Sequence, residues 1–327
     1  MMKKLVVGIM ISAGFIYLSI RGIELDEMWV SLKDTRYGFL FPAALIVFFV
    51  QVLRSIRWGV ILSPIEKIDQ KTLFPITCIG FMAIILAPMR TGEIVRPYLV
   101  SLKRAVPMGS GIATVLIERV MDVLMLLAFL FFVLLQAPLP SWLIKGGNIL
   151  LAILLFVLTL IVILIIRPRA IVKTLFPITS RLPQRICVRI ERFILNFING
   201  FAVISDMKKL FQVFSLSFLI WIFSAFAVYA LFSFYNLHLG FTEALTVMVI
   251  TALGISIPSA PGFLGNFQFA CIVALSLWGV SKTNALAFAM VYYFLGIGII
   301  AFLSLLSLPF IDIPMRQIFS LRNLGRD

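Results

Sequence analysis

The stretch Phe74–Tyr98 reads "FPITCIGFMAIILAPMRTGEIVRPY", an apolar run followed directly by two arginines and a glutamate held between two prolines. A proline disfavours helix in the residues before it, so we expect Pro88 and Pro97 to limit helix on the two sides of this polar stretch. An interrupted backbone is tolerated at membrane depth only inside protein or beside water. The stretch is therefore either an ordinary polar loop or a polar turn that the apolar run holds at a particular place.

The composition places the whole chain in a membrane. Of 327 residues, 62% are apolar and only 13% are charged, which is too little polar surface for a soluble protein. We therefore expect an all-α integral membrane protein, with residues 1–327 forming one polytopic domain. The excess of 28 basic over 14 acidic residues is explained by the positive-inside bias of membrane proteins, so no nucleic acid partner is expected.

The cysteines and the single histidine exclude several kinds of site. Cys78, Cys187 and Cys271 lie far apart, and His238 is the only histidine in the chain. Common Cys/His metal sites and Ser-His or Cys-His catalytic sets need closer or more numerous groups. We expect no metal, no cofactor and no catalytic residue.

Six apolar runs approach the length of about 20 residues that a membrane span needs. The predicted spans are residues 5–20, 38–53, 109–136, 148–166, 210–235 and 284–311. With both termini cytoplasmic, most Lys and Arg residues fall on the cytoplasmic side, including the basic segment 167–209. Arginines at helical spacing in that segment predict an amphipathic helix at the membrane surface, although the segment would serve equally well only to enforce topology.

Two further apolar stretches are interrupted by proline and glycine. Residues 73–104 have basic residues on both flanks, which favours a re-entrant hairpin over a crossing. Residues 242–281 fit either one hairpin or two full spans, so the chain has six spans and two hairpins, or seven to eight spans. The expected hairpin hinges are Pro88, Gly92 and Pro97 in the first stretch and Pro261, Gly262 and Gly265 in the second.

Both stretches contain I-T-x-[IL]-G followed by A-P-x-x-x-G-[EN], beginning at Ile76 and at Ile250. Since the charge bias makes one enter from each side, this match predicts an inverted internal repeat, as transporters often have. Two unrelated Pro/Gly kinks are the alternative.

Charges also occur inside the predicted span 109–136. Glu118 and Asp122 share a helix face, and Arg119 lies about 100° round from Glu118. Each charge near the middle of the bilayer costs about 2.5 to 3.5 kcal/mol on insertion scales, so partners are required. The partners expected from this sequence are Arg90 and Arg96 for the carboxylates and Glu93 for Arg119.

Two interpretations of these charges stay open. Either the ion pairs only fix the first hairpin to the span, or the arginines bind an anionic headgroup, because guanidinium is a planar fork suited to phosphate. Arg54, Arg57 and Trp58 are read as an interfacial anchor. Asn266 and Gln268 would bind a neutral or zwitterionic part of a substrate or, equally, the interrupted backbone.

Four motifs in order, "RxxRW", "APxRxGExxRPY", "ERxxD" and "PSAPGxLGxF", resemble the transmembrane region of lysylphosphatidylglycerol synthases, the flippase-like integral membrane family. The resemblance implies movement of an anionic, aminoacylated or polyprenyl-phosphate-linked lipid between the leaflets of a prokaryotic plasma membrane. The expected substrate-binding residues are Arg90, Glu93, Arg96, Glu118, Arg119, Asp122, Asn266 and Gln268.

Two departures from the family qualify that expectation. The chain ends at Asp327 without the aminoacyltransferase domain of the bifunctional synthases, so we expect no lysyl transfer and allow for a separate lipid-modifying enzyme as a partner. Gln268 also stands where many relatives carry a glutamate. The alternatives to a flippase are a membrane enzyme acting on a lipid headgroup, with Glu118 or Asp122 as base, and a non-transporting membrane scaffold.

Overall fold

The computed structural model describes residues 2–23, 35, 37–87, 92–136, 141–166, 184–235, 237–257 and 260–311. All regular structure in these ranges is helical. This confirms the all-α fold class that the composition predicts.

A long helix covers each of the six predicted spans. These helices are α1 (Met2–Ile20), α3 (Leu40–Leu62), α6 (Met108–Gln136), α7 (Ser141–Ile166), α10 (Met207–Phe234) and α13 (Lys282–Ser307). Among the described residues, four helices, α3, α7, α10 and α13, are long and apolar enough to cross a membrane. The structure is thus that of a multi-pass membrane protein; α6 is longer still but carries charges along its length.

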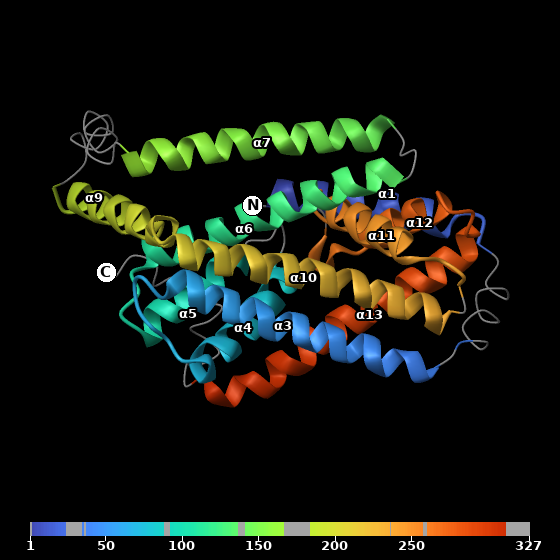
Figure 1. The fold of residues 1–327 in the computed structure, drawn as a ribbon, viewed down its shortest axis with the longest axis horizontal. Helices are drawn as coiled ribbons and strands as arrows, with labels where there is room; N and C mark the ends of the chain where they lie inside the picture. Colours follow the sequence, from blue (N-terminus) through green and yellow to red (C-terminus); the bar gives the residue numbers. More distant parts are fainter. Residues whose placement is uncertain are drawn as a thin grey trace.

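The long helices lie roughly along one axis of the molecule (Figure 1). α3 and α10 pack against each other, and the largest apolar core brings α6, α10 and α13 together with shorter helices. Phe232 of α10 and Phe288 of α13, both buried, place their ring centroids 5.4 Å apart in this core. Apolar residues on all sides of these helices fit elements that face either protein or lipid.

Two helix–break–helix segments complete the fold. In the first broken segment, α4 (Gln70–Leu86) is followed by a 3₁₀ turn at 92–94 and α5 (Val95–Lys103). In the second broken segment, α11 (Phe241–Gly254) is followed by a 3₁₀ turn, η4 (Pro261–Phe263), and α12 (Asn266–Ser276). Figure 1 shows α4 and α5 toward the end of the molecule that holds α9 (Gln184–Asn199), and α11 and α12 toward the opposite end. α4 also contacts η4, so the two segments meet inside the molecule.

The expected hinges have different roles in the structure. Pro88 lies outside the described residues. A Cβ on Gly92 would collide with the backbone of Ala83, so the glycine allows the returning chain to touch α4. Pro97 does not limit a helix as expected. It is the third residue of α5, in the first turn, where a missing N–H leaves no hydrogen bond unmade.

The second break depends on left-handed backbone. Gly262 and Gly265 have φ of 78° and 84°, values that a glycine adopts without steric cost. Pro261 opens the 3₁₀ turn η4, a position that suits its fixed φ. Phe263 also has a positive φ of 58°, which is strained for a bulky residue.

The basic segment contributes one described helix. α9 packs on the start of α6, where the Ser110 hydroxyl donates a hydrogen bond to the carbonyl of Asn196 at 2.6 Å. The polar residues of α9 lie on one side of the helix and the apolar residues on the other, so it is amphipathic as the sequence predicts. Its position at a membrane surface stays a prediction.

Candidate functional site

A buried ion pair joins α3 to α6. Nη1 of Arg57 donates to Oδ1 of Asp122 at 2.7 Å and to the hydroxyl of Ser217, on α10, at 3.0 Å. Nε of Arg57 also lies 3.6 Å from Oε1 of Glu118. With 1% of its side chain exposed, Arg57 is a charge fully inside the protein, and its partners supply the compensation that such burial requires.

A second buried pair joins α5 to α6. Nη1 of Arg96 donates to Oε2 of Glu118 at 2.5 Å, and the guanidinium lies over the ring of Trp58 with 4.2 Å to its centroid. Neither Arg96 nor Glu118 is exposed by more than 1%. The sequence predicts Arg96 as a partner for these carboxylates, and the structure brings it to Glu118.

The interfacial-anchor interpretation is wrong for Arg57 and Trp58. Trp58 has no exposed surface, and its indole N–H donates to the hydroxyl of Thr114 at 3.1 Å. Both side chains are buried inside the protein, and α3 continues to Leu62, past the expected end of the span at residue 53. Among the described residues, Arg57 and Arg119 are the ion-pair partners of Asp122. The expected partner Arg90 lies outside the described residues.

The third charged group of α6 is less deeply buried. Nη1 of Arg119 lies 3.5 Å from Oδ2 of Asp122 and 3.9 Å from Oε1 of Glu93, the partner that the sequence predicts. The side chains of Arg119 and Glu93 are 29% and 25% exposed. We call Arg57, Glu93, Arg96, Glu118, Arg119 and Asp122 the ion cluster.

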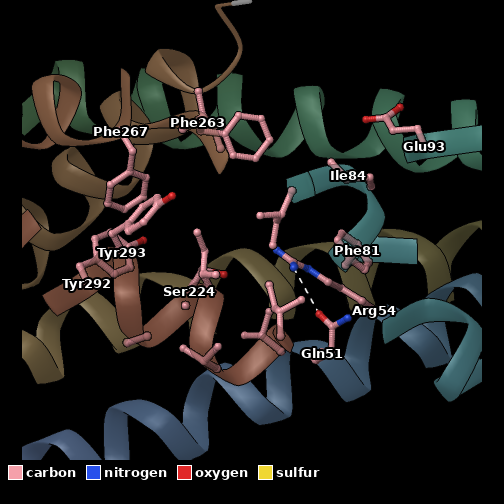
Figure 2. A pocket seen from close by; sticks show the side chains of 18 of the residues that line it. Gln51, Arg54, Phe81, Ile84, Glu93, Ser224, Phe263, Phe267, Tyr292 and Tyr293 are labelled. Carbon is pink, nitrogen blue, oxygen red and sulfur yellow. Dashed lines mark hydrogen bonds between the residues drawn. The ribbon is translucent and has the colours of Figure 1, made fainter. Parts of the chain in front are cut away.

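A cavity of about 290 Å³ lies beside the ion cluster and between the tips of the two broken segments. Arg54 projects into it from α3, while Phe267, Tyr292 and Tyr293 gather on the opposite side (Figure 2). Glu93 and Arg119 also line it. We call it the arginine cavity. A neighbouring cavity of about 190 Å³ shares Arg54 and Arg119 and reaches Asp122.

Arg54 differs from the arginines of the ion cluster. In the part of the chain that the structure describes, its hydrogen bond goes to Oε1 of Gln51 at 3.4 Å, and its guanidinium lies 4.6 Å from the ring centroid of Phe81. No carboxylate of those residues lies within 4.0 Å of it, although Asp122 attracts its charge from a longer distance. A long, neutral hydrogen bond compensates a guanidinium poorly, and Arg54 lines both cavities.

Asn266 and Gln268 serve the interrupted backbone. Nδ2 of Asn266 donates to the carbonyls of Gly254 at 3.4 Å and Ile257 at 3.1 Å. Oε1 of Gln268 accepts from the N–H of Gly265 at 2.8 Å. Neither side chain lines the arginine cavity, so the structure supports the backbone alternative for both.

Sequence reasoning missed Arg54 and Arg57 as site residues. A signal was present, because Arg54 and Arg57 are one helical turn apart, as are Glu118 and Asp122. When two helices face each other, a pair of arginines on one and a pair of carboxylates on the other can form ion pairs. The arginines follow the apolar run of α3, where hydropathy alone suggests that the span has ended.

Comparisons with known proteins agree with this architecture. The family model of the lysylphosphatidylglycerol synthase TM region matches residues 5–304. A UPF0104 membrane protein of Methanothermobacter thermautotrophicus is 22% identical over 322 residues, covering 94% of each chain. Two UPF0104 membrane proteins of Methanocaldococcus jannaschii are each 27% identical, over 63% and 78% of this chain and 84% and 86% of their own.

The family match covers most of the chain and extends through the broken segments and the ion cluster. The chain belongs to the lysylphosphatidylglycerol synthase TM region family of membrane proteins, which fits a lipid-related role in the membrane.

Proposed function

We propose that this member of the family moves a lipid with an anionic headgroup between the two leaflets, and that the arginine cavity holds the headgroup. The observation that carries the proposal is Arg54, a guanidinium without a carboxylate partner in the described residues, facing a cavity between two broken helices. Discontinuous helices that meet around a site inside the membrane are typical of transporters.

The lengths of the shorter helices support re-entrant hairpins. α5 has nine residues and α12 has eleven, which gives them lengths of roughly 14 and 17 Å at about 1.5 Å per residue. Neither reaches across a hydrocarbon core of about 30 Å. Each broken segment would then enter and leave by the same side, and their places toward opposite ends of the molecule (Figure 1) are consistent with an inverted pair.

Two arginines have a structural role in this proposal, and two others contact the lipid headgroup. Arg57 and Arg96 are held by Glu118 and Asp122 with almost no exposed surface, so they join α3, α5 and α6. Arg54 and Arg119 line the cavity and reach its contents. Alternating access would arise when one broken segment, together with its neighbours, rocks against this fixed group of helices.

The proposal places the protein in a prokaryotic plasma membrane with both termini cytoplasmic, and it makes the protein a transporter, not an enzyme. Asp122 is a poor candidate for a catalytic base because it already accepts hydrogen bonds from Arg57 and from the indole N–H of Trp221 at 3.4 Å. A separate enzyme would supply or modify the lipid.

Reconstitution tests the proposal. We would place purified protein in vesicles containing a fluorescent phosphatidylglycerol and measure how much label an external reductant reaches. Wild-type protein should expose inner-leaflet label, and Arg54→Gln should abolish most of that exchange. Arg104→Gln is the matched control, since Arg104 is surface-exposed and pairs with Asp69 away from the cavity. Undiminished exchange with folded Arg54→Gln, or none with wild type, would contradict the proposal.

A further inference from the structure

We infer that an apolar ligand, a hydrocarbon chain carrying one hydroxyl group, binds in a cavity enclosed by the second broken segment, α1 and α7. This cavity has a volume of about 290 Å³. We call it the apolar cavity. Among the described residues it shares no lining residue with the arginine cavity or the cavity beside it. The inference therefore concerns a separate site and does not depend on the proposed function.

The walls of the apolar cavity consist almost entirely of hydrocarbon. The second broken segment supplies most of them, including Ile250, Leu253 and Phe269, and α1 adds Phe15. Asn266 is the one polar side chain among the described residues that line the cavity. A cavity with apolar walls stays dry, and leaving it empty forgoes dispersion contacts along its whole surface. Hydrocarbon is therefore the occupant that these walls favour.

The apolar cavity is open toward α7. This helix packs mainly on α6 and lies at the edge of the molecule (Figure 1). Gly146 of α7 lines the cavity, and a Cβ added to it would meet no atom of the described chain within 4 Å. Ile149 and Ile153, which follow on the same face of α7, are exposed. The surrounding lipid therefore reaches the cavity along this face.

Asn266 determines the polar group of the ligand. Its Nδ2 donates to the carbonyls of Gly254 and Ile257, which fixes the orientation of the amide. Its Oδ1 accepts no hydrogen bond in the part of the chain that the structure describes, although only 2% of the residue is exposed. A buried acceptor without a donor is destabilising, so its presence at the wall of a cavity indicates a ligand that donates a hydrogen bond.

A hydroxyl group is the donor that suits these surroundings. No charged side chain lines the cavity among the described residues, so an ammonium group there would lack a counter-charge. A single O–H satisfies Oδ1 of Asn266 and brings little other polar surface into the cavity. Long-chain alcohols and diacylglycerols both combine one hydroxyl with hydrocarbon. These two sources share the required chemistry and differ in bulk.

The apolar cavity also borders the interrupted backbone. Gly254 and Ile257 line it, whereas Ile255, between them in the sequence, lines the arginine cavity. The end of α11 is therefore in contact with both spaces. A chain bound in the apolar cavity adds apolar contacts to the break of the second segment.

Photolabelling tests the inference. Detergent-solubilised protein would be irradiated with an eight-carbon alcohol that carries a diazirine, and the adducts would be located by peptide mass spectrometry. They should fall within residues 250–257 and 266–273. At equal free concentration, 1-octanol should compete about fivefold better than heptyl methyl ether, its isomer without a donor, which is the scale of one neutral hydrogen bond. Competition by 1-dodecanol and by dioctanoylglycerol shows which of the two sources fits.

Two variants fill the cavity and one serves as a matched control. Gly146→Leu, from α7, and Val273→Phe, from α12, should each lower labelling about tenfold or more, because overpacking opposes binding. Gly298→Leu changes another helical glycine whose Cβ meets nothing within 4 Å of the described chain, away from the cavity, and should label like wild type. Thermal unfolding would establish that the variants are folded.

Three results would overturn the inference. They are adducts confined to other parts of the chain, equal competition by the alcohol and its ether isomer, and labelling that persists in folded variants with a filled cavity. Competition by neither 1-dodecanol nor dioctanoylglycerol would contradict it as well. Lipid exchange in vesicles would be judged separately, since it depends on the arginine cavity.

Discussion

The two broken segments share a sequence pattern but are held in place by different interactions. The first is tied to the rest of the protein by charge, because Arg96 of α5 pairs with Glu118 of α6 deep in the interior. The second is held by apolar packing in the largest core, and its polar contacts are short-range hydrogen bonds, in which Asn266 and Gln268 bind backbone groups three to twelve residues away. A buried ion pair thus fixes the first segment, whereas neutral contacts alone hold the break of the second among the described residues.

The hydrogen bonds that join the tip of the second segment to other helices are neutral ones. The Tyr293 hydroxyl of α13 donates to the carbonyl of Gly262 at 2.8 Å, and the Ser12 hydroxyl of α1 accepts from the N–H of Ala260 at 2.8 Å. Single neutral hydrogen bonds contribute about 0.5–1.5 kcal/mol each to stability. Contacts of this size hold the tip yet allow it to be released.

The largest expected effect comes from breaking the charged attachment. Glu118→Leu leaves Arg96 buried without a carboxylate and removes one of the two that serve Arg57, so the free energy of unfolding should fall by about 3–5 kcal/mol. Unfolding in a denaturing detergent titration measures the change. The double variant Arg96→Met, Glu118→Leu should regain much of the loss. If the single and double variants are equally unstable, the pair does not hold the first segment.

A smaller effect is expected at the hinge of the second segment. Gly265→Ala places a side chain at φ 84° and brings its Cβ within 2.5 Å of the Ser12 carbonyl oxygen, so we expect a loss of about 1–3 kcal/mol. Gly298→Ala is the control, since its Cβ meets nothing within 4 Å and its backbone is helical. A Gly265→Ala protein as stable as the control would mean that this turn is not under constraint.

The smallest effect tests whether the second segment is the freer one. Tyr293→Phe removes one hydrogen bond to the tip and should lower overall stability by only about 1 kcal/mol. Amide hydrogen exchange at residues 260–265 should nevertheless become faster, while exchange at 92–97 stays the same. Equal acceleration in both segments would show that they move together.

Much of the fold could be predicted because hydropathy and length decide where an apolar helix lies. The six spans and the two interruptions appear in the sequence as apolar runs and as proline and glycine. The contacts of Arg96 with Glu118 and of Glu93 with Arg119 could also be predicted, since buried charges need partners and few were available.

The rest of the site depends on depth and orientation, which hydropathy does not report. Arg54 and Arg57 end the apolar run of α3, so they looked like residues at the membrane surface, but the helix continues to Leu62 inside the protein. Which arginine is left without a carboxylate is decided by the rotation of α3 against α6. A single sequence gives the charges that must pair but not the geometry that leaves one over.

The shared carboxylates of α6 also have a consequence for biogenesis. Each of the three charged residues of α6 has an ion-pair partner earlier in the chain: Arg57 on α3, Glu93 before α5, and Arg96 within α5. When α6 leaves the ribosome, every opposite charge that it needs has already been synthesised, and chains generally assemble from the N-terminal side. The most costly helix to insert is thus never required to enter the membrane alone.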